Sequence, residues 1–261
     1  VFLDRFTTIE QVTKQNAKKW IEEILQAGHS VGTANRLLIS SRNYWTYLRQ
    51  QDVVEVDNEP LTLKGLLPSV KKKNKKGYIP FEPENVVKLW REAKKRGDQS
   101  LADLIYLGAY TGARIEEICS MRLENISDKA IKITASKTNA GIREVPIHSE
   151  LFSTIKKLKD SSEDGYLLSG LTFNKYGDRS NNLGKRFGKL KTELGFAPKL
   201  EVFHSIRKTL VTLLENAGVP EGIAADIVGH EKPNITYKLY SGGNVLDIKK
   251  EAIEKAKYPF K

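Results

Sequence analysis

A short lysine-rich stretch most constrains the fold of this chain, because a hydrophobic core cannot continue through it. The segment "SVKKKNKKGYIPFEPEN" begins at residue 69 and carries five lysines within residues 71–76, followed by a glycine and two prolines. Its few apolar side chains cannot offset the entropy that ordering would remove, which is typical of a linker. We therefore predict two units, residues 1–66 and 83–261, joined by a linker over 67–82.

The predicted linker has two interpretations that its residues leave equally open. One is a solvated tether that only sets the reach between the two units. The other is a basic strap that lies along a phosphate backbone while the two units grip it from opposite sides. Its lysines are Lys71, Lys72, Lys73, Lys75 and Lys76.

The apolar residues before the linker recur at helical spacing, which predicts a small all-helical unit. A first helix is predicted over 7–27, with Thr7 or Thr8 as its cap. A second is predicted over 33–48, and the side opposite its apolar stripe carries Arg36, Arg42 and Arg49.

After the linker, helical periodicity is interrupted by two strand-like runs. The runs "AIKITAS" and "REVPI" are separated by "KTNAGI", whose Asn and Gly suit a hairpin turn. The fold class is therefore mainly helical, with a mixed α/β, mostly helical second unit that holds one small antiparallel sheet. Its helices are predicted at 84–97, 100–111, 113–123, 150–159, 180–195, 204–216 and 220–228, then in a short segment through Tyr240 and at 244–257.

Charge and composition narrow the class of partner. The formal net charge is +11, from 43 Lys and Arg against 32 Asp and Glu, which favours a polyanion and most often nucleic acid. No run approaches the roughly 18 apolar residues of a membrane helix, and the start "VFLDRFTTIE" is not a signal peptide. Cys119 is the only cysteine, which fits a reducing cytosol. The chain opens on Val1 and its one methionine is Met121, so we expect further residues upstream.

Four basic side chains lie in contexts suited to holding an anion. Arg114 follows a glycine at a helix start, where a guanidinium can add to free backbone N–H groups. Lys137 lies at the hairpin edge, and His204 and Arg207 share a helix face at i and i+3 in "HSIRKT". Taken singly, these residues have ordinary explanations. Arg114 could pair with Glu117, Lys137 could be a solvated turn residue, and His204 could cap a helix.

The order of these residues along the chain is a specific pattern, although no single residue in it is specific. "YTGARIEEICSMRLENI", "SKTNAGIREVPI" and "HSIRKTLVTLLENAGVPEGIAADIVGHEKPNITYKLY" resemble the catalytic domain of the tyrosine recombinase (phage integrase) family over most of residues 80–243. The shared order is an Arg after T-G-x, a hairpin Lys, H-x-x-R, G-H and then a Tyr. Residues 1–66 are also similar to that family's helical, SAM-like core-binding domain. One departure is Lys208, where the family often carries a His.

The resemblance implies how each residue would act on DNA. Attack of a side-chain oxygen on a phosphodiester builds charge on the non-bridging oxygens, which preorganised cations stabilise without a metal or other cofactor. Arg114 and Arg207 would bind those oxygens in a planar fork, and Lys137 would protonate the 5′-hydroxyl leaving group. His204 would accept or hold the nucleophile's proton and His230 would donate to the phosphate. Glu117 would support the Arg114 region.

The nucleophile would be a tyrosine that forms a 3′-phosphotyrosyl link, so that rejoining needs no ATP. The family usually places it nine residues beyond the G-H His, where this chain has Leu239. Tyr240 lies at ten, and Thr236 precedes it in the family's T-x-x-x-Y spacing, so we expect one extra residue in "EKPN". Tyr240 is therefore the predicted nucleophile, and Tyr237 the alternative.

The family also implies the partners. They are double-stranded recombination sites, further copies of this chain in a tetramer on DNA, and accessory DNA-bending proteins, in the cytoplasm of a prokaryotic cell at its nucleoid. The two units would form a clamp around duplex DNA. The amphipathic tail helix over 244–257 fits both its own unit and a neighbouring subunit, and the family resemblance favours docking on a neighbour. Besides the linker lysines, the predicted DNA contacts, all expected to be exposed, are Arg36, Arg42, Arg49, Lys175, Arg179, Lys185 and Arg186.

The predicted function is therefore a site-specific recombinase that integrates or excises a phage or other mobile element. An alternative from another class is a non-catalytic DNA-binding regulator derived from an integrase, although all six reactive positions are kept. A Xer-type or transposon recombinase shares the chemistry, and a relaxing topoisomerase fits less well because of residues 1–66. A metal-dependent nuclease is disfavoured, because four histidines and no clustered Asp, Glu and His give no metal site.

Overall fold

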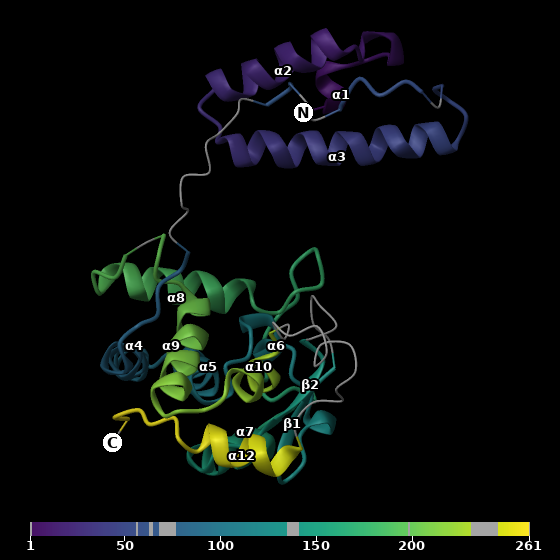
Figure 1. Ribbon diagram of the computed structural model, residues 1–261. Coiled ribbons are helices and arrows are strands. Elements are labelled where there is room, and N and C mark those ends of the chain that lie inside the picture. Colours follow the sequence, from purple (N-terminus) through teal and green to yellow (C-terminus); the bar gives the residue numbers. More distant parts are fainter. Residues whose placement is uncertain are drawn as a thin grey trace. The chain divides into compact units, whose positions relative to one another are not determined.

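The chain divides into two compact units, residues 1–75 and 76–261 (Figure 1). The computed structural model describes residues 2–55, 57–62, 65–67, 77–134, 141–197, 199–230 and 245–260. Within these ranges the second unit is mainly helical with a two-stranded antiparallel sheet, which confirms the predicted fold class. Each unit is described by itself below.

The first unit is built on two long helices. The helix α2 spans Lys14–Gln26 and α3 spans Val31–Gln50, preceded by the short turns α1 (Phe2–Arg5) and η1 (Ile9–Gln11). The predicted start at residue 7 is wrong, because the Thr13 side chain accepts from the backbone N–H of Asn16 at 3.2 Å and caps α2 there. Their apolar faces meet in a core that includes Trp20, Ile21, Leu38, Trp45 and Leu61.

The second unit is organised around one helix that is apolar on every side. This helix, α5 (Gln99–Thr111), packs against α4 (Pro83–Lys95) and against α9 (Phe203–Asn216). Ten of its thirteen residues are buried, so it forms the centre of the core rather than a face of it. The remaining helices are α6 (Ile115–Cys119), η2 (Leu123–Asn125), η4 (Ser149–Leu151), α7 (Phe152–Asp160), α8 (Asn181–Glu193), α10 (Glu221–Val228) and α12 (Leu246–Ile253).

The sheet pairs β1 (Ala130–Ile133) with β2 (Arg143–Pro146) in antiparallel register, with Ile133 opposite Arg143. The predicted strands are therefore both present. The tip of the predicted hairpin, residues 135–140, lies outside the described residues, as does the predicted short helix through Tyr240.

The predicted linker is too long at its C-terminal end. Phe81 is 2% exposed and belongs to the core of the second unit. The backbone N–H of Ile79 donates to the carbonyl of Leu200 at 3.0 Å, and the Thr209 hydroxyl donates to the carbonyl of Phe81 at 2.7 Å. The lysine run itself, residues 71–76, lies outside the described residues.

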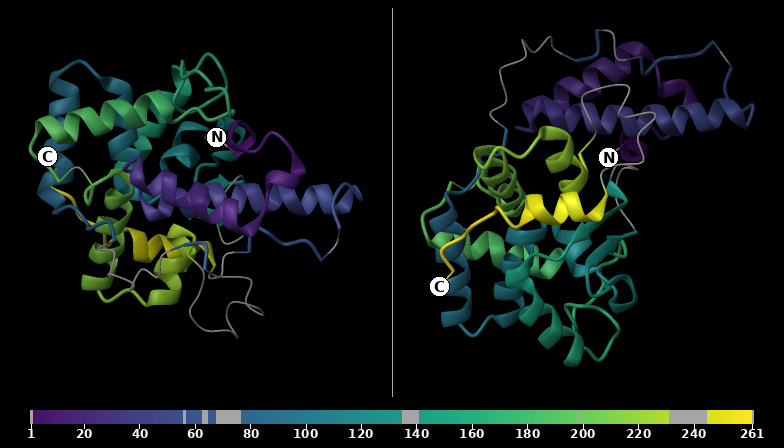
Figure 2. Two further views of the ribbon diagram at one scale, coloured as in Figure 1. Left: turned by 90° about the horizontal axis from the view of Figure 1, so that it is seen from above. Right: turned by 60° about the horizontal axis from the view of Figure 1, so that its bottom comes forward.

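The C-terminal segment packs on its own unit within this chain, and docking on a neighbouring subunit in an assembly stays a prediction. The helix α12 lies beside α10 and β2 (Figures 1 and 2). Beyond it, Tyr258 and Phe260 are buried against Tyr106 and Tyr110, with ring centroids between 4.7 and 5.7 Å apart. The apolar side chains of this segment therefore complete the core in which α5 lies.

The helix α5 ends at a glycine where any side chain would be strained. Gly112 has φ +59°, and a Cβ built on it would lie 2.8 Å from Leu210 Cδ2 and 2.9 Å from Val228 Cγ1. Both the left-handed backbone and the close approach of α9 and α10 therefore require the absence of a side chain. Arg114 follows two residues later, so the turn at Gly112 sets where its backbone lies.

We expect Gly112→Ala to destabilise the second unit by about 3 kcal/mol, because strain and overpacking add at this position. Gly218→Ala is the matched control: Gly218 also has positive φ, +71°, but nothing lies within 4 Å of its Cβ position. The control should lose only about 1 kcal/mol. Urea unfolding of both variants measures the difference, and equal losses would contradict the packing argument.

The carboxylate of Glu254 fastens the C-terminal segment to the start of α7. Its two oxygens accept from the backbone N–H of Ser149 at 2.7 Å and from the Ser149 hydroxyl at 2.8 Å, and Lys250 donates to it as well. Burial alone would raise the pKa of Glu254, but the hydrogen bonds from Lys250 and Ser149 outweigh it and lower the pKa to about 2. Ionised Glu254 is therefore the form that the folded state prefers.

We expect Glu254 to contribute stability above pH 4.5, and this contribution to disappear as the pH falls from about 4.5 to 2, because protonation then breaks these bonds. The loss should be about 2 kcal/mol. In Glu254→Gln, the free energy of unfolding should change less with pH over this range. Glu251 is an exposed carboxylate on the same helix, and Glu251→Gln should keep the pH dependence of the wild type. Unfolding free energies between pH 6 and 2.5 test this, and identical curves for wild type and Glu254→Gln would rule it out.

Candidate active site

Arg114 is held at the first turn of α6 by the carboxylate of Glu117. The Arg114 backbone N–H donates to Glu117 Oε2 at 2.9 Å, and its Nη1 donates to Oε1 at 2.6 Å. The Glu117 side chain is 3% exposed, whereas that of Arg114 is 29% exposed. A buried carboxylate thus orients a guanidinium that still reaches the surface, which agrees with the supporting role expected of Glu117.

A second guanidinium, which the sequence analysis did not single out, meets the same carboxylate from β2. Arg143 Nη2 donates to Glu117 Oε2 at 3.2 Å, while its Nε and Nη1 donate to the carbonyls of Ile227 and Gly141 at 2.8 and 2.7 Å. Its side chain is 5% exposed. The sequence contained a signal for the burial of Arg143. Side chains alternate between the two faces of a strand, so in "REVPI" Arg143 shares a face with the buried Val145.

Arg207 is the most buried of the three arginines. It lies on α9 at 2% exposure, and its Nη1 and Nη2 donate to the carbonyls of Gly112 and Gly229 at 2.8 and 3.4 Å. Its Nε is buried and has no hydrogen-bond partner among the described residues. Arg207 therefore ties the end of α5 to the end of α10 and keeps one N–H for a further acceptor.

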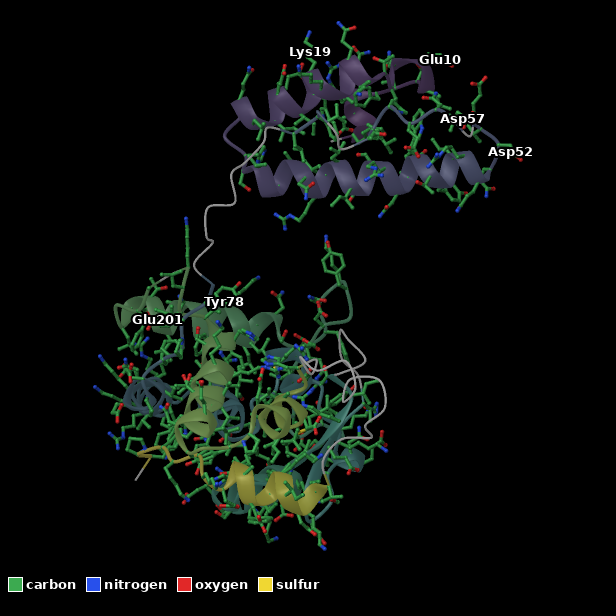
Figure 3. All side chains as sticks on the ribbon, in the orientation of Figure 1. Glu10, Lys19, Asp52, Asp57, Tyr78 and Glu201 are labelled. Atoms are coloured by element: carbon green, nitrogen blue, oxygen red, sulfur yellow. The ribbon has the colours of Figure 1, made fainter. Side chains whose placement is uncertain are left out.

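The two predicted histidines lie on either side of Arg207 along the chain. His204 is half-buried in the first turn of α9, one turn before Arg207. Its ring centroid is 6.0 Å from that of Tyr78, which is labelled in Figure 3. His230 is exposed and follows Gly229, whose φ of +72° ends α10. The chain turn at Gly229 thus brings His230 next to the carbonyl that Arg207 binds.

The pKa values show that these groups share one electrostatic environment. Burial, together with the charges of Arg143 and Arg114, lowers the pKa of Arg207 to about 9. Burial and the charges of Arg207 and Arg114 also lower the pKa of His204. For His230, loss of hydration acts first and Arg207 next, and its pKa falls to about 4. Both imidazoles are therefore neutral at pH 7, while the arginines remain charged.

Glu117 stays ionised inside this cluster. Burial alone would raise the pKa of its carboxyl, but the charge of Arg143 and the hydrogen bonds from Arg114 and Arg143 outweigh burial and lower it. Three guanidinium groups against one carboxylate leave two positive charges in a partly buried site. Such a site binds an anion with oxygens that accept several N–H bonds, such as a phosphate.

An open cleft of about 600 Å³ adjoins this cluster. Arg114 and Glu117 line it on one side, Lys132 and Ile133 of β1 line another, and Gly177 and Asp178 complete it. The partly exposed guanidinium of Arg114 therefore borders open space beside the cluster.

Three of the predicted site residues lie outside the described residues: Lys137, Tyr237 and Tyr240. The described residues bring together Arg114, Glu117, His204, Arg207 and His230 and add Arg143 to them.

The predicted DNA contacts differ in their exposure. The expectation that Arg179 is exposed is wrong: it is 2% exposed and donates to Asp164 and to the carbonyls of Cys119 and Leu168, because its guanidinium is needed inside the unit. Arg186 pairs with Asp98, and Arg49 pairs with Glu59, yet both remain partly exposed. The exposed members are Arg36, Lys175 and Lys185, and Arg42 is partly exposed.

The comparison with known families shows which family the chain belongs to. The model of the phage integrase family matches residues 81–244, which include every predicted catalytic position. The chain belongs to this family. It is a tyrosine-type site-specific recombinase.

Its relatives include proteins named as tyrosine recombinases and as transposon transposases. The tyrosine recombinase XerA of Pyrococcus furiosus is 22% identical over 247 residues, which cover 94% of this chain and 81% of XerA. The transposase of transposon Tn916 from Enterococcus faecalis is 23% identical over 265 residues, which cover 90% of this chain and 64% of the transposase.

Solved structures share the fold of this recombinase. The Tn1549 transposon integrase in complex with circular intermediate DNA has a TM-score of 0.60 and 21% identity, covering 92% of this chain and 84% of that one. A lambda integrase tetramer bound to a Holliday junction has a TM-score of 0.65 and 15% identity, covering 87% and 66%.

Two features absent from the described residues bear on other functions. None of their helices is long and apolar enough to cross a membrane. No group of three or more His, Cys, Asp or Glu among them is placed to hold a metal ion.

We expect Glu117→Gln to slow covalent attachment of the recombinase to DNA by about 100-fold, because the guanidinium groups of Arg114 and Arg143 lose the charge that orients them. Affinity for the same DNA should change little, since the arginines remain. Glu124→Gln, an exposed carboxylate in η2, is the matched control. Single-turnover rates with thermal unfolding of each variant test this, and a Glu117→Gln rate equal to that of Glu124→Gln would contradict it.

Proposed function

We propose that this recombinase cuts and rejoins DNA through Tyr240 to integrate or excise a phage or other mobile element. The observation that carries the proposal is the buried Arg207 Nε, which has no partner among the described residues and lies in a cluster with two excess positive charges. A non-bridging phosphate oxygen is the acceptor that satisfies both the N–H and the charge. Relatives named as transposases favour a mobile element.

The reaction divides between groups that hold the phosphate and groups that move protons. Arg114 and Arg207 bind the non-bridging oxygens, and Arg143 holds Glu117 in place beside them. Because both guanidinium groups are set by hydrogen bonds before DNA arrives, little reorganisation accompanies the transition state. His230 adds a hydrogen bond to the same phosphate from its neutral imidazole.

The Tyr240 oxygen attacks phosphorus, a P–O bond forms to the tyrosine, and the bond from phosphorus to the 5′ oxygen breaks. His204 takes the phenol proton, which its lowered pKa permits because the imidazole is unprotonated at pH 7. Lys137 gives a proton to the 5′ oxygen. The sheet supports this role for Lys137. The chain leaves β1 at Ile133 and enters β2 at Arg143, so the segment that carries Lys137 connects these two strands. The 3′-phosphotyrosyl bond keeps the energy needed for rejoining.

Double-stranded DNA and further copies of this chain are the proposed partners. Two units joined by a lysine-rich segment fit a clamp around a duplex, and exchange of strands between two sites needs four active tyrosines and hence a tetramer. The lambda integrase that shares the fold is a tetramer on a Holliday junction. Accessory DNA-bending proteins are a further proposed partner in the cytoplasm.

We expect Tyr240→Phe to abolish the covalent protein–DNA adduct while DNA binding persists, because the phenol oxygen is the attacking atom. The substrate is a duplex that carries the element's own recombination site with a nick that traps the intermediate, in buffer containing EDTA, since no metal is required. Tyr237→Phe is the matched control and should still form the adduct. The opposite pattern, an adduct with Tyr240→Phe and none with Tyr237→Phe, would move the nucleophile to Tyr237. No adduct from the wild type would reject the proposed chemistry.

A further inference from the structure

The segment between Leu171 and Arg179 presents unusually exposed aromatic side chains. Tyr176 is 77% exposed and Phe173 is 57% exposed. The Nζ of Lys175 lies 4.9 Å from the centroid of the Tyr176 ring. The segment, here called the Tyr176 loop (residues 171–178), thus offers an aromatic ring and a positive charge side by side to the surroundings.

The Tyr176 loop is a built turn. The Asn174 side-chain oxygen accepts from the backbone N–H groups of Tyr176 and Asp178 at 2.8 and 2.9 Å, and the Asn174 backbone N–H donates to the Asp178 carbonyl at 2.8 Å. Gly177 supplies the positive φ of +83° that closes the turn. The exposure of Tyr176 is therefore imposed by the backbone of the turn.

The base of the loop is fastened to the helix that carries the active-site carboxylate. Arg179 donates to the carbonyl of Cys119, at the end of α6, at 3.0 Å, and its guanidinium lies 3.6 Å from the centroid of the Tyr166 ring. Glu116, the neighbour of Glu117 on α6, accepts from the backbone N–H groups of Arg179 and Ser180 at 3.0 and 2.8 Å. This explains why Arg179 is buried: it fixes the loop to α6.

The loop also borders the cleft beside the anion site. Gly177 and Asp178, the two residues after Tyr176, line the cleft that Arg114 and Glu117 line on another side. A duplex whose phosphate is held by Arg114 therefore passes next to the loop. The aromatic ring there can contact deoxyribose or base edges, and the ammonium of Lys175 can contact a phosphate.

We propose that Tyr176 is a DNA-contacting residue that helps to select the sequence or shape of the recombination site beside the phosphate that is cut. This inference rests on the proposed function and adds to it a specificity element on the Tyr176 loop. A rigid aromatic contact is sensitive to groove width and base-step geometry, so it discriminates between sites without forming a direct hydrogen bond to a base.

The experiment compares Tyr176→Ala with a matched control in the same unit. Phe152 is 46% exposed and the Nζ of Lys250 lies 5.0 Å from its ring centroid, so it repeats the chemistry of the Tyr176 pair. It lies on α7, beside α12 and away from α8 (Figure 1). The probe is a pool of 40-base-pair duplexes with 20 randomised central positions, from which each variant enriches its preferred sequences.

We expect the wild type and Phe152→Ala to enrich the same motif. Tyr176→Ala should lose the preference at adjacent positions of that motif and bind the wild-type consensus about tenfold more weakly. Tyr176→Phe, which keeps the ring, should behave as the wild type. Equal motifs and affinities for Tyr176→Ala and the wild type would overturn the inference, as would a loss confined to assembly of several subunits on DNA, which would make the loop a protein contact.

The wild-type result separates this inference from the proposed function. If the wild type forms the covalent adduct and Tyr176→Ala keeps the full motif, only the role of Tyr176 fails. If the wild type enriches no motif and forms no adduct, the proposed function fails first.

Discussion

The carboxylate of Glu117 is the interaction on which the site depends. It is almost fully buried, it accepts hydrogen bonds from Arg114 and Arg143, and its charge also acts on Arg207. Burying guanidinium groups is costly unless they are paired, and one carboxylate offsets only part of this cost. The cluster therefore keeps excess positive charge that a bound phosphate can neutralise.

The same cluster joins five elements of the second unit, since Arg207 itself lies on α9. Glu117 connects α6 to β2, and Arg207 connects the ends of α5 and α10 through the carbonyls of Gly112 and Gly229. Gly112 permits this arrangement because a side chain there would collide with α9 and α10. The groups proposed to hold the phosphate are thus also groups that hold the fold, and a site of this kind is ordered before a substrate binds.

Helix α6 connects the arginine site to an exposed loop on the surface. Its two neighbouring glutamates have different partners: Glu117 accepts from the arginines of the site, and Glu116 accepts from the backbone at the base of the Tyr176 loop. A five-residue helix thereby relates the position of the anion site to that of an exposed aromatic side chain.

Sequence alone determined the periodicity of α3, α4 and α5, the two strands, and the ordered pattern that led to Arg114, His204, Arg207 and His230. These features depend on neighbours close in the chain or on residue types that the chemistry demands. It did not determine that Thr13 caps α2, since several threonines there can serve.

Only the tertiary structure decided the partners of charged groups and the packing of the tail. Whether Arg143 and Arg179 face solvent or the interior depends on carbonyls and carboxylates far away in the chain, such as Ile227 and Asp164. The C-terminal segment is amphipathic in sequence, and that pattern fits a neighbouring subunit as well as its own unit. Its burial against Tyr106 and Tyr110 was decided by the apolar surface that α5 leaves there, because hydrophobic burial is non-directional and goes to whichever matching surface lies within reach.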